Sequence, residues 1–212
     1  MGVPLQHPGD GVTMSDCNRL MVVGYSGAGK DTACLYLAEV TRLRFAGTTS
    51  VYLARHVASR LGVSVQEAAR TRHRDRRLWH RVGNEIRRQD PGLLVRESLE
   101  HAEITGGVRG IEEVQACRRE QLVDLIVWIA NDRVRRDSTV AFGPDDCDLV
   151  VPNHGSLEEF HRRLLHLARR AGMPMKPSAG GRSGTVPGSP ETRRPHDRPE
   201  GAVRPLAGSG DE

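Results

Sequence analysis

Residues 20–40 place a short apolar run, a glycine-rich loop and a helical pattern in direct succession, an order that few folds accommodate. The run Leu20-Met21-Val22-Val23 is wholly apolar, which is typical of a strand buried on both faces of a parallel sheet. Three glycines follow within residues 24–29, and glycine permits backbone angles and close approaches that other residues do not. Apolar residues then recur at helical spacing in residues 31–40. We therefore expect a buried strand, a tight loop and a helix that begins at the loop.

Lysine is rare in this chain, and one of its lysines ends the glycine-rich loop. The chain has 31 basic residues, of which only Lys30 and Lys176 are lysine. Residues 24–30 fit the phosphate-binding pattern G-x-x-x-x-G-K, with Asp31 where Ser or Thr is usual and Thr32 one place later. A lysine ammonium is a compact charge on a thin stem, so it reaches between two phosphates where a planar guanidinium does not.

The loop N–H groups and the N-terminus of the following helix are expected to face one anion. The alternative, a glycine-rich turn with only a structural role, accounts less well for the agreement of strand, loop, lysine and helix. The sequence therefore predicts that the phosphates of ATP are bound by Gly24, Ser26, Gly27, Ala28, Gly29, Lys30, Asp31 and Thr32. Asp31 and Thr32 are also the expected ligands of Mg²⁺.

Composition divides the 212 residues into three parts. Residues 1–16 carry scattered proline and glycine without the pattern of a signal peptide. Residues 173–212 contain seven prolines and seven glycines with almost no large apolar side chains, so they cannot bury enough surface to fold. We expect a flexible N-terminus, one α/β domain over residues 17–172, and a disordered tail over residues 173–212.

The sequence favours a cytoplasmic protein that does not enter a membrane. No apolar run approaches the length of a membrane span. The four cysteines are scattered without a C-x-x-C pair, which is typical of free thiols in a reducing compartment rather than of a disulfide framework or a zinc site. The oligomeric state is left open by these features.

Strand and helix patterns alternate along the domain, which indicates a mostly parallel sheet of about four to five strands with helices on both faces. Ser64 and Ser156 each stand three residues before a glutamate, the spacing of a capping box at a helix start. The helix after Ser64 is expected to be arginine-rich, broken near Gly83 and ended before Pro91, with Trp79 in the core. Strands are expected at residues 20–23, 43–46, 102–105, 124–130 and 148–151, and helices at residues 31–40, 51–61 (capped by Ser50), 65–90, 93–99, 111–119 and 157–171.

Arginines in the middle of the chain supply candidate ligands for a second phosphate. Residues 70–96 hold nine arginines and two histidines against three acidic residues. Arg77 and Arg87 in this segment, and Arg109 at the carboxyl end of a predicted strand, are the candidates for bidentate contacts with an acceptor phosphate. The alternative at each position is an arginine that only faces solvent. Nucleic-acid binding is less favoured, because no nucleic-acid motif is present and aromatic residues are few.

Residues 131–137, Asn-Asp-Arg-Val-Arg-Arg-Asp, follow the predicted strand at residues 124–130. Their arginines resemble those of a short lid that closes over a transferred phosphate. We expect Arg133 and Arg136 to contact that phosphate and Asp137 to orient one of them.

Four short segments carry a family resemblance. The loop ending Gly29-Lys30-Asp31-Thr32 has Asp directly after the lysine, and residues 83–87 read G-x-x-x-R. Residues 105–113 are similar to a strand-end element D-x-R-x-x-x-E, and residues 148–157 are similar to a closing strand, turn and helix. Together they resemble the phage-type deoxynucleoside monophosphate kinases, a group within the nucleoside monophosphate kinase-like P-loop proteins. The resemblance covers residues 19–168, and only the loop is specific by itself.

The resemblance implies a P-loop NTPase three-layer sandwich that uses ATP and Mg²⁺ to phosphorylate a nucleoside or deoxynucleoside monophosphate. The residues that it places at the transferred phosphoryl group are Lys30, Arg109, Arg133 and Arg136, and those at the acceptor are Arg77, Arg87 and Arg109. Two alternatives remain: a P-loop kinase for another small phosphorylated acceptor such as dephospho-coenzyme A, and a nucleotide-binding regulatory protein without turnover.

One departure from the family concerns the metal. The family strand ends in an aspartate that organises Mg²⁺, whereas residues 104–107 of this chain read Ile-Thr-Gly-Gly. Because Mg²⁺ keeps several waters and needs few protein ligands, it is then expected to rely on Asp31, Thr32 and water. A carboxylate from Glu112 or Glu113 is the alternative.

Overall fold

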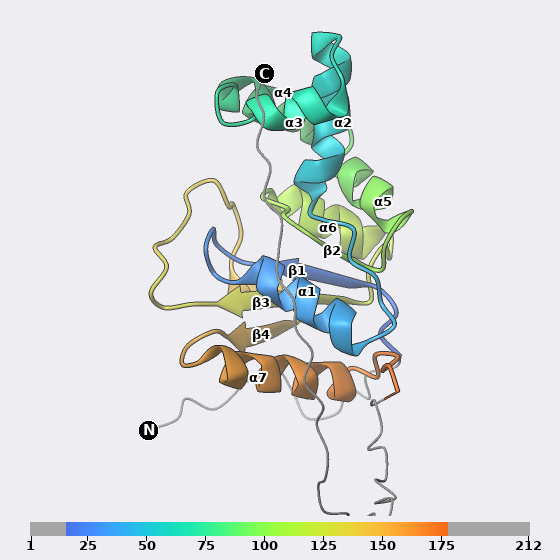
Figure 1. Cartoon of the computed structure of the whole chain (residues 1–212), viewed down its shortest axis with the longest axis vertical. Coiled ribbons are helices and arrows are strands. Elements are labelled where there is room, and N and C mark those ends of the chain that lie inside the picture. The colour runs from blue at the N-terminus through green and yellow to red at the C-terminus, as the bar shows by residue number, and fades with distance from the viewer. Residues whose placement is uncertain (1–15, 178–212) are drawn as a thin grey trace, which may run out of the picture. The chain divides into compact units, whose positions relative to one another are not determined.

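A computed structural model describes residues 16–177, which contain one four-stranded sheet (Figure 1). The strand order is β2-β1-β3-β4, and every pair of neighbours is parallel. The predicted α/β class with a mostly parallel sheet is therefore confirmed. The strands are β1 (Leu20–Val23), β2 (Ile104–Gly106), β3 (Leu125–Ala130) and β4 (Leu149–Pro152).

Helices cover both faces of the sheet because successive strand side chains point to opposite faces. Leu20 and Val22 of β1 belong to one core cluster, which the first and last helices complete. Met21 and Val23 belong to the other, which two middle helices complete. The first pair is α1 (Lys30–Val40) and α7 (Leu157–Arg170), and the second pair is α5 (Leu93–Leu99) and α6 (Ile111–Arg119).

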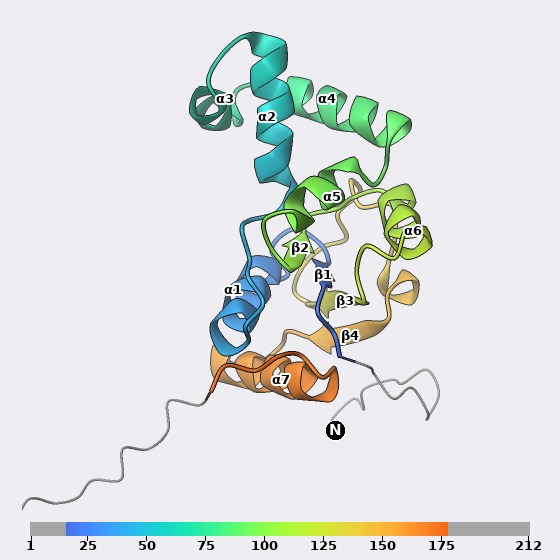
Figure 2. The same cartoon turned by 90° about the vertical axis from the view of Figure 1, so that its right-hand side faces the viewer.

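Three further helices form a group with a core of its own beyond β2 (Figures 1 and 2). Val57, Trp79 and Val82 are buried in that core, and Leu94 of α5 joins it to the sheet-bearing part. The group therefore lies on the side of the sheet where β2 is the edge strand. Its helices are α2 (Thr49–Leu61), α3 (Val65–Thr71) and α4 (Arg76–Gln89).

The arginine-rich helix is broken earlier than predicted. The break lies at residues 72–75, where the N–H groups of Arg74 and Asp75 both donate to the carbonyl of Thr71. Gly83 lies inside α4 and is buried, so the predicted break at that position was wrong. A Cβ at Gly83 would come within 3.4 Å of Leu53 Cδ2, so the glycine serves close packing between α2 and α4.

Other boundaries also differ from the predictions. Residues 43–46 form no strand: only Phe45 pairs, as a single parallel bridge to Ile104. The strand predicted at residues 102–105 begins at Ile104 instead. Helix α2 begins at Thr49, with Thr48 at the N-cap, so Ser50 lies inside the helix and is not its cap as predicted. The two predicted capping boxes mark helix starts correctly, because Ser64 and Ser156 both stand at N-caps and accept from the expected N–H groups. A short 3₁₀ turn, Pro144–Asp146, precedes β4.

The domain continues past residue 172, where the tail was predicted to begin. Met173 is buried, with 3% of its surface exposed, and it joins the core beneath α1 and α7. The N–H of Arg42 donates to the carbonyl of Pro174 at 2.7 Å, and the N–H of Lys176 donates to the carbonyl of Val40 at 3.0 Å. The predicted flexible start and the rest of the predicted tail lie outside the described residues. Within residues 16–177, no helix is long and apolar enough to cross a membrane.

Candidate functional site

The glycine-rich loop connects β1 to α1 at the carboxyl end of the sheet, as predicted (Figure 1). Gly24, Gly27 and Gly29 all have positive φ, at 142°, 81° and 98°. Side chains would also collide there. A Cβ at Gly24 would lie 2.6 Å from the carbonyl oxygen of Ile129, and one at Gly29 would lie 2.3 Å from the side-chain nitrogen of Asn153. Both the backbone angle and the space therefore require glycine at these two positions.

Asn153 fastens the turn after β4 to this loop. Its Nδ2 donates to the carbonyl of Ala28 at 2.8 Å, and its own N–H donates to the carbonyl of Ala130 at 2.6 Å. Asn153 reaches the loop because β4 lies beside β3. The side chain therefore holds one side of the loop from a neighbouring element.

Lys30 begins α1 and reaches back across the loop. Its Nζ donates to the carbonyl of Tyr25 at 2.6 Å. Burial lowers the pKa of Lys30, and the nearby charge of Arg109 lowers it further, whereas Asp31 and Asp137 act in the opposite direction. The charges of Arg109 and of Asp137, which lies in the segment after β3, therefore both act on Lys30.

Glu113 positions two of the predicted arginines. Its side chain is 1% exposed, and Oε2 accepts from the N–H groups of Arg109 and Gly110, both at 2.8 Å, and from Nε of Arg87 at 3.0 Å. Nη1 of Arg87 also donates to Asn84 Oδ1 at 2.9 Å. The carboxylate thus fixes the turn that carries Arg109 and the side chain of Arg87 at once. Oε2 with three donors is not available to a metal, and Oε1 is buried, so this geometry does not support the alternative of Glu113 as a metal ligand.

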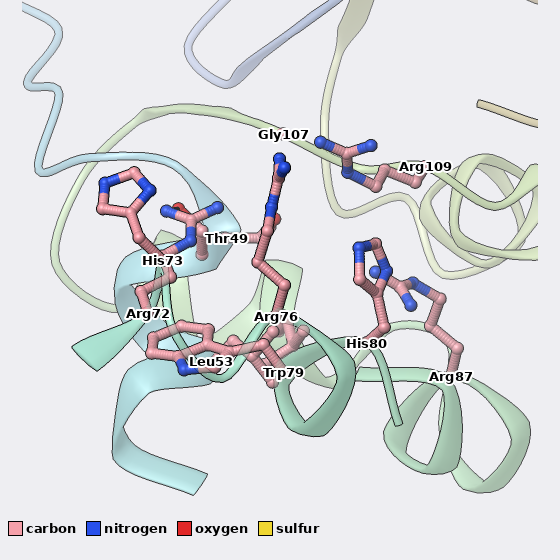
Figure 3. A pocket seen from close by; sticks show the side chains of 12 residues that line it. Thr49, Leu53, Arg72, His73, Arg76, Trp79, His80, Arg87, Gly107 and Arg109 are labelled. Carbon is pink, nitrogen blue, oxygen red and sulfur yellow. Dashed lines mark hydrogen bonds between the residues drawn. The ribbon is translucent and has the colours of Figure 1, made fainter. Parts of the chain in front are cut away.

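Arg109 and Arg87 line a pocket of about 310 Å³ between the helical group and the end of β2 (Figure 3). This volume lies at the lower end of the range for small-molecule sites. An adjoining pocket of about 660 Å³ shares His80, Arg87 and Arg109 with it and adds Glu112. The first pocket contains no carboxylate, so it suits an anion. Its remaining side chains are Thr49, Ser50, Leu53, Arg72, His73, Arg76, Trp79 and Leu94, with Gly107 at the backbone.

The helical group contributes arginines that the sequence did not single out. Arg76 extends from the first residue of α4 toward Gly107 (Figure 3). The guanidinium of Arg72 lies 5.3 Å from the ring centre of Trp79, and its Nη1 donates to Ser50 Oγ at 3.3 Å. Trp79 is buried as predicted, and it is also a wall of the pocket. The predicted Arg77 is exposed and lies outside both pockets, because one residue along a helix turns the side chain by about 100°.

Residues 131–140, which include the predicted lid, form neither helix nor strand. Arg133 and Arg136 are exposed, and neither forms an ion pair with a described residue. The carboxylate of Asp137 does not orient either of them. It faces Arg109 instead, with Oδ2 at 3.5 Å from Nη1. The structure therefore brings Asp137, and not the two predicted lid arginines, to the site.

Asp31 and Thr32 lie in the first turn of α1, directly after Lys30. Asp31 is exposed and Thr32 is half-buried, so both remain accessible to a ligand at the loop. Among residues 16–177, no three His, Cys, Asp or Glu side chains are grouped as a metal site would require. The residues fit a magnesium ion that takes most of its ligands from water and nucleotide phosphates, and not a site built from protein carboxylates.

The sequence matches no protein-family model and no curated protein.

Proposed function

We propose that the protein transfers a phosphoryl group from ATP to a nucleoside or deoxynucleoside monophosphate and so forms the diphosphate. Arg109 carries this proposal, because it lines the arginine pocket and its charge also acts on Lys30 of the loop. A donor phosphate on the loop and an acceptor phosphate in the pocket would meet beside that one side chain. The parallel sheet with the loop after β1 supports a P-loop NTPase sandwich as the framework.

The donor half of the site consists of the loop and the start of α1. The helix has no side-chain cap at Gly29, so its first N–H groups remain free for phosphate oxygens. Lys30 would exchange the carbonyl of Tyr25 for the phosphates. Asp31 and Thr32 would hold Mg²⁺, which supplies charge neutralisation at the phosphates when it is bound.

The acceptor half is the arginine pocket. Glu113 holds the side chain of Arg87 and the backbone of Arg109, so the guanidinium of Arg87 and the turn that carries Arg109 are positioned before a ligand arrives. A guanidinium forms bidentate contacts with a phosphate, and fixed geometry is the main contribution a protein makes to phosphoryl transfer. Leu53, Trp79 and Leu94 provide an apolar wall for the sugar or base.

A coupled assay of ADP release, with Mg·ATP and a panel of nucleoside and deoxynucleoside monophosphates, tests the proposal. We expect release that depends on one or a few acceptors and that falls by about a hundredfold or more in Lys30→Ala, the scale typical of removing a charge that stabilises a transition state. Lys176→Ala is the matched control, since Lys176 is the other lysine and its Nζ contacts only the carbonyl of Ala38. Transfer that survives unchanged in Lys30→Ala would refute the proposal.

The same assay separates the alternatives. Release with dephospho-coenzyme A and with no monophosphate would identify another acceptor on the same framework. ATP binding without release would favour a nucleotide-binding regulator. The nucleotide-binding regulator has one observation in its favour. β2 ends at Gly106 and is followed by Gly107, so the strand end carries no carboxylate for the metal.

A further inference from the structure

Asp137 is a half-buried carboxylate that contacts the site from the segment after β3. Its side chain is 17% exposed. Oδ1 accepts from the N–H of Thr139 at 2.9 Å and from its hydroxyl at 2.5 Å, and Oδ2 lies 3.5 Å from Nη1 of Arg109. Arg109 also donates to the hydroxyl of Thr139, and its carbonyl accepts from Ala141 at 2.8 Å. The segment therefore holds Nη1 of Arg109 through Asp137 and Thr139, and the backbone of Arg109 through Ala141.

The same carboxylate lies near the glycine-rich loop. Thr139 contributes most to lowering the pKa of Asp137, and Arg109 and the backbone N–H of Ser26 in the loop add to the effect. Asp137 in turn favours the charged form of Lys30. The segment also lies beside the loop, since Val134 Cγ2 would be 3.8 Å from a Cβ added at Gly27. The carboxylate of Asp137 therefore pairs with Arg109 and also interacts electrostatically with the amide of Ser26 and with Lys30.

These three groups are the ones that the proposed function assigns to phosphate. We propose that the carboxylate of Asp137 takes the place of a phosphate against Arg109, and that a nucleotide phosphate displaces it. A carboxylate and a phosphate cannot share the same cations cheaply, because like charges a few ångströms apart repel strongly where water is partly excluded. Binding must therefore separate Asp137 from Arg109. The guanidinium of Arg109 is then free to bind phosphate. Binding of the donor nucleotide at the loop would thereby make Arg109 available in the acceptor pocket.

The inference depends on the nucleotide-binding half of the proposed function and not on turnover. The test is the Kd of ADP in the presence of EDTA, measured by titration calorimetry on the full chain. Asp137→Asn keeps the shape of the side chain and removes the competing charge. We expect ADP to bind about three- to fivefold more tightly to this variant at low ionic strength, the scale of a partly exposed ion pair. The gain should shrink as salt is added.

Asp132→Asn is the matched control, because Asp132 lies in the same segment, is exposed and forms no ion pair with a described residue. It changes the net charge equally and should leave the Kd as in the wild type. If urea shows that Asp137→Asn is unfolded, Asp137→Ser removes the charge with a smaller polar side chain, and the same comparison is made with it.

Tighter binding confined to the Asp137 variant, including binding that only the variant shows, supports the inference. An unchanged Kd overturns it, and weaker binding overturns it by showing that Asp137 assists the ligand. Absence of ADP binding in every variant overturns it as well, since the loop would then hold no nucleotide. A wild type that binds ADP but releases none from any acceptor refutes the kinase proposal and leaves this comparison intact.

Discussion

Glu113→Gln should destabilise the domain more than its conservative nature suggests. The carboxylate is 1% exposed, and its Oε2 accepts three hydrogen bonds, two from backbone N–H groups and one from Nε of Arg87. The other oxygen, Oε1, is buried without a hydrogen-bond partner in the described part of the chain. An amide of the same shape keeps one acceptor oxygen but loses the negative charge that faces Arg87.

The expected loss follows from these contacts. Hydrogen bonds to a charged group contribute about 1.5–3 kcal/mol and neutral ones about 0.5–1.5 kcal/mol, so weakening each of the three by about 1 kcal/mol costs about 3 kcal/mol. The new NH₂ group would take the buried position of Oε1, where no acceptor faces it, which adds about 1 kcal/mol. We therefore expect a total of about 4 kcal/mol, which corresponds to a fall in Tm of about 8–16 °C for a domain of this size.

Urea unfolding at pH 7, followed by far-UV circular dichroism, measures the free energy of unfolding of the variant and the wild type. Glu112→Gln is the matched control, because Glu112 is the preceding residue and is exposed, so its change should stay within about 0.5 kcal/mol. A Glu113→Gln protein as stable as this control would show that the buried carboxylate does not hold Arg87 and the turn of Arg109. The reasoning about a preset acceptor pocket would then fail with it.

Two further predictions concern the edges of the domain. A chain ending at Gly172 should lose about 2 kcal/mol or more of unfolding free energy, measured by urea, because it lacks the buried Met173. A chain ending at Pro177 should unfold as the full chain does. Equal urea midpoints for the two truncated chains would show that residues 173–177 do not stabilise the core. Glu103→Gln should lower the Tm at pH 7, because Glu103 accepts from the backbone and side chain of Arg44, which holds the pKa of Glu103 below its usual range. A carboxylate with a lowered pKa stabilises the fold above its unfolded-state pKa, and that contribution is lost as the pH falls through the folded-state pKa. The difference in Tm between the variant and the wild type should therefore shrink as the pH falls below about 4. A difference in Tm that does not shrink on acidification would contradict this account.

The strands that proved predictable are the ones with continuous apolar runs. β1 and β3 lie in the middle of the sheet and are buried on both faces, so their sequences are apolar without interruption. Residues 43–46, Leu-Arg-Phe-Ala, interrupt the apolar run with an exposed arginine, and only Phe45 pairs, as a single bridge to Ile104. The break in the arginine-rich helix was misplaced because Gly83 signals a helix break by propensity, while its packing against Leu53 favours the helix.

The loop was predictable because its pattern is local, and its partners were not because they come from elsewhere in the chain. Lys30 and the loop glycines stand at fixed spacing within seven residues. Asn153 is more than a hundred residues away and reaches Ala28 only because β4 lies beside β3. Arg76 rather than Arg77 faces the pocket because α4 begins at residue 76, and that boundary depends on the turn before it.

Two carboxylates, and not the number of arginines, distinguish Arg109 from the others in this chain. Glu113 is buried and accepts from the backbone N–H of Arg109, and a hydrogen bond to a charged group contributes about 1.5–3 kcal/mol. Asp137 is more exposed and faces the guanidinium at 3.5 Å, a contact of a type that contributes about 0–1 kcal/mol. The contact between Glu113 and the backbone of Arg109 is therefore the stronger of the two. The guanidinium of Arg109 can change partners while its backbone stays in place. An arginine fixed at one end and releasable at the other is suited to a site where phosphate must enter, react and leave.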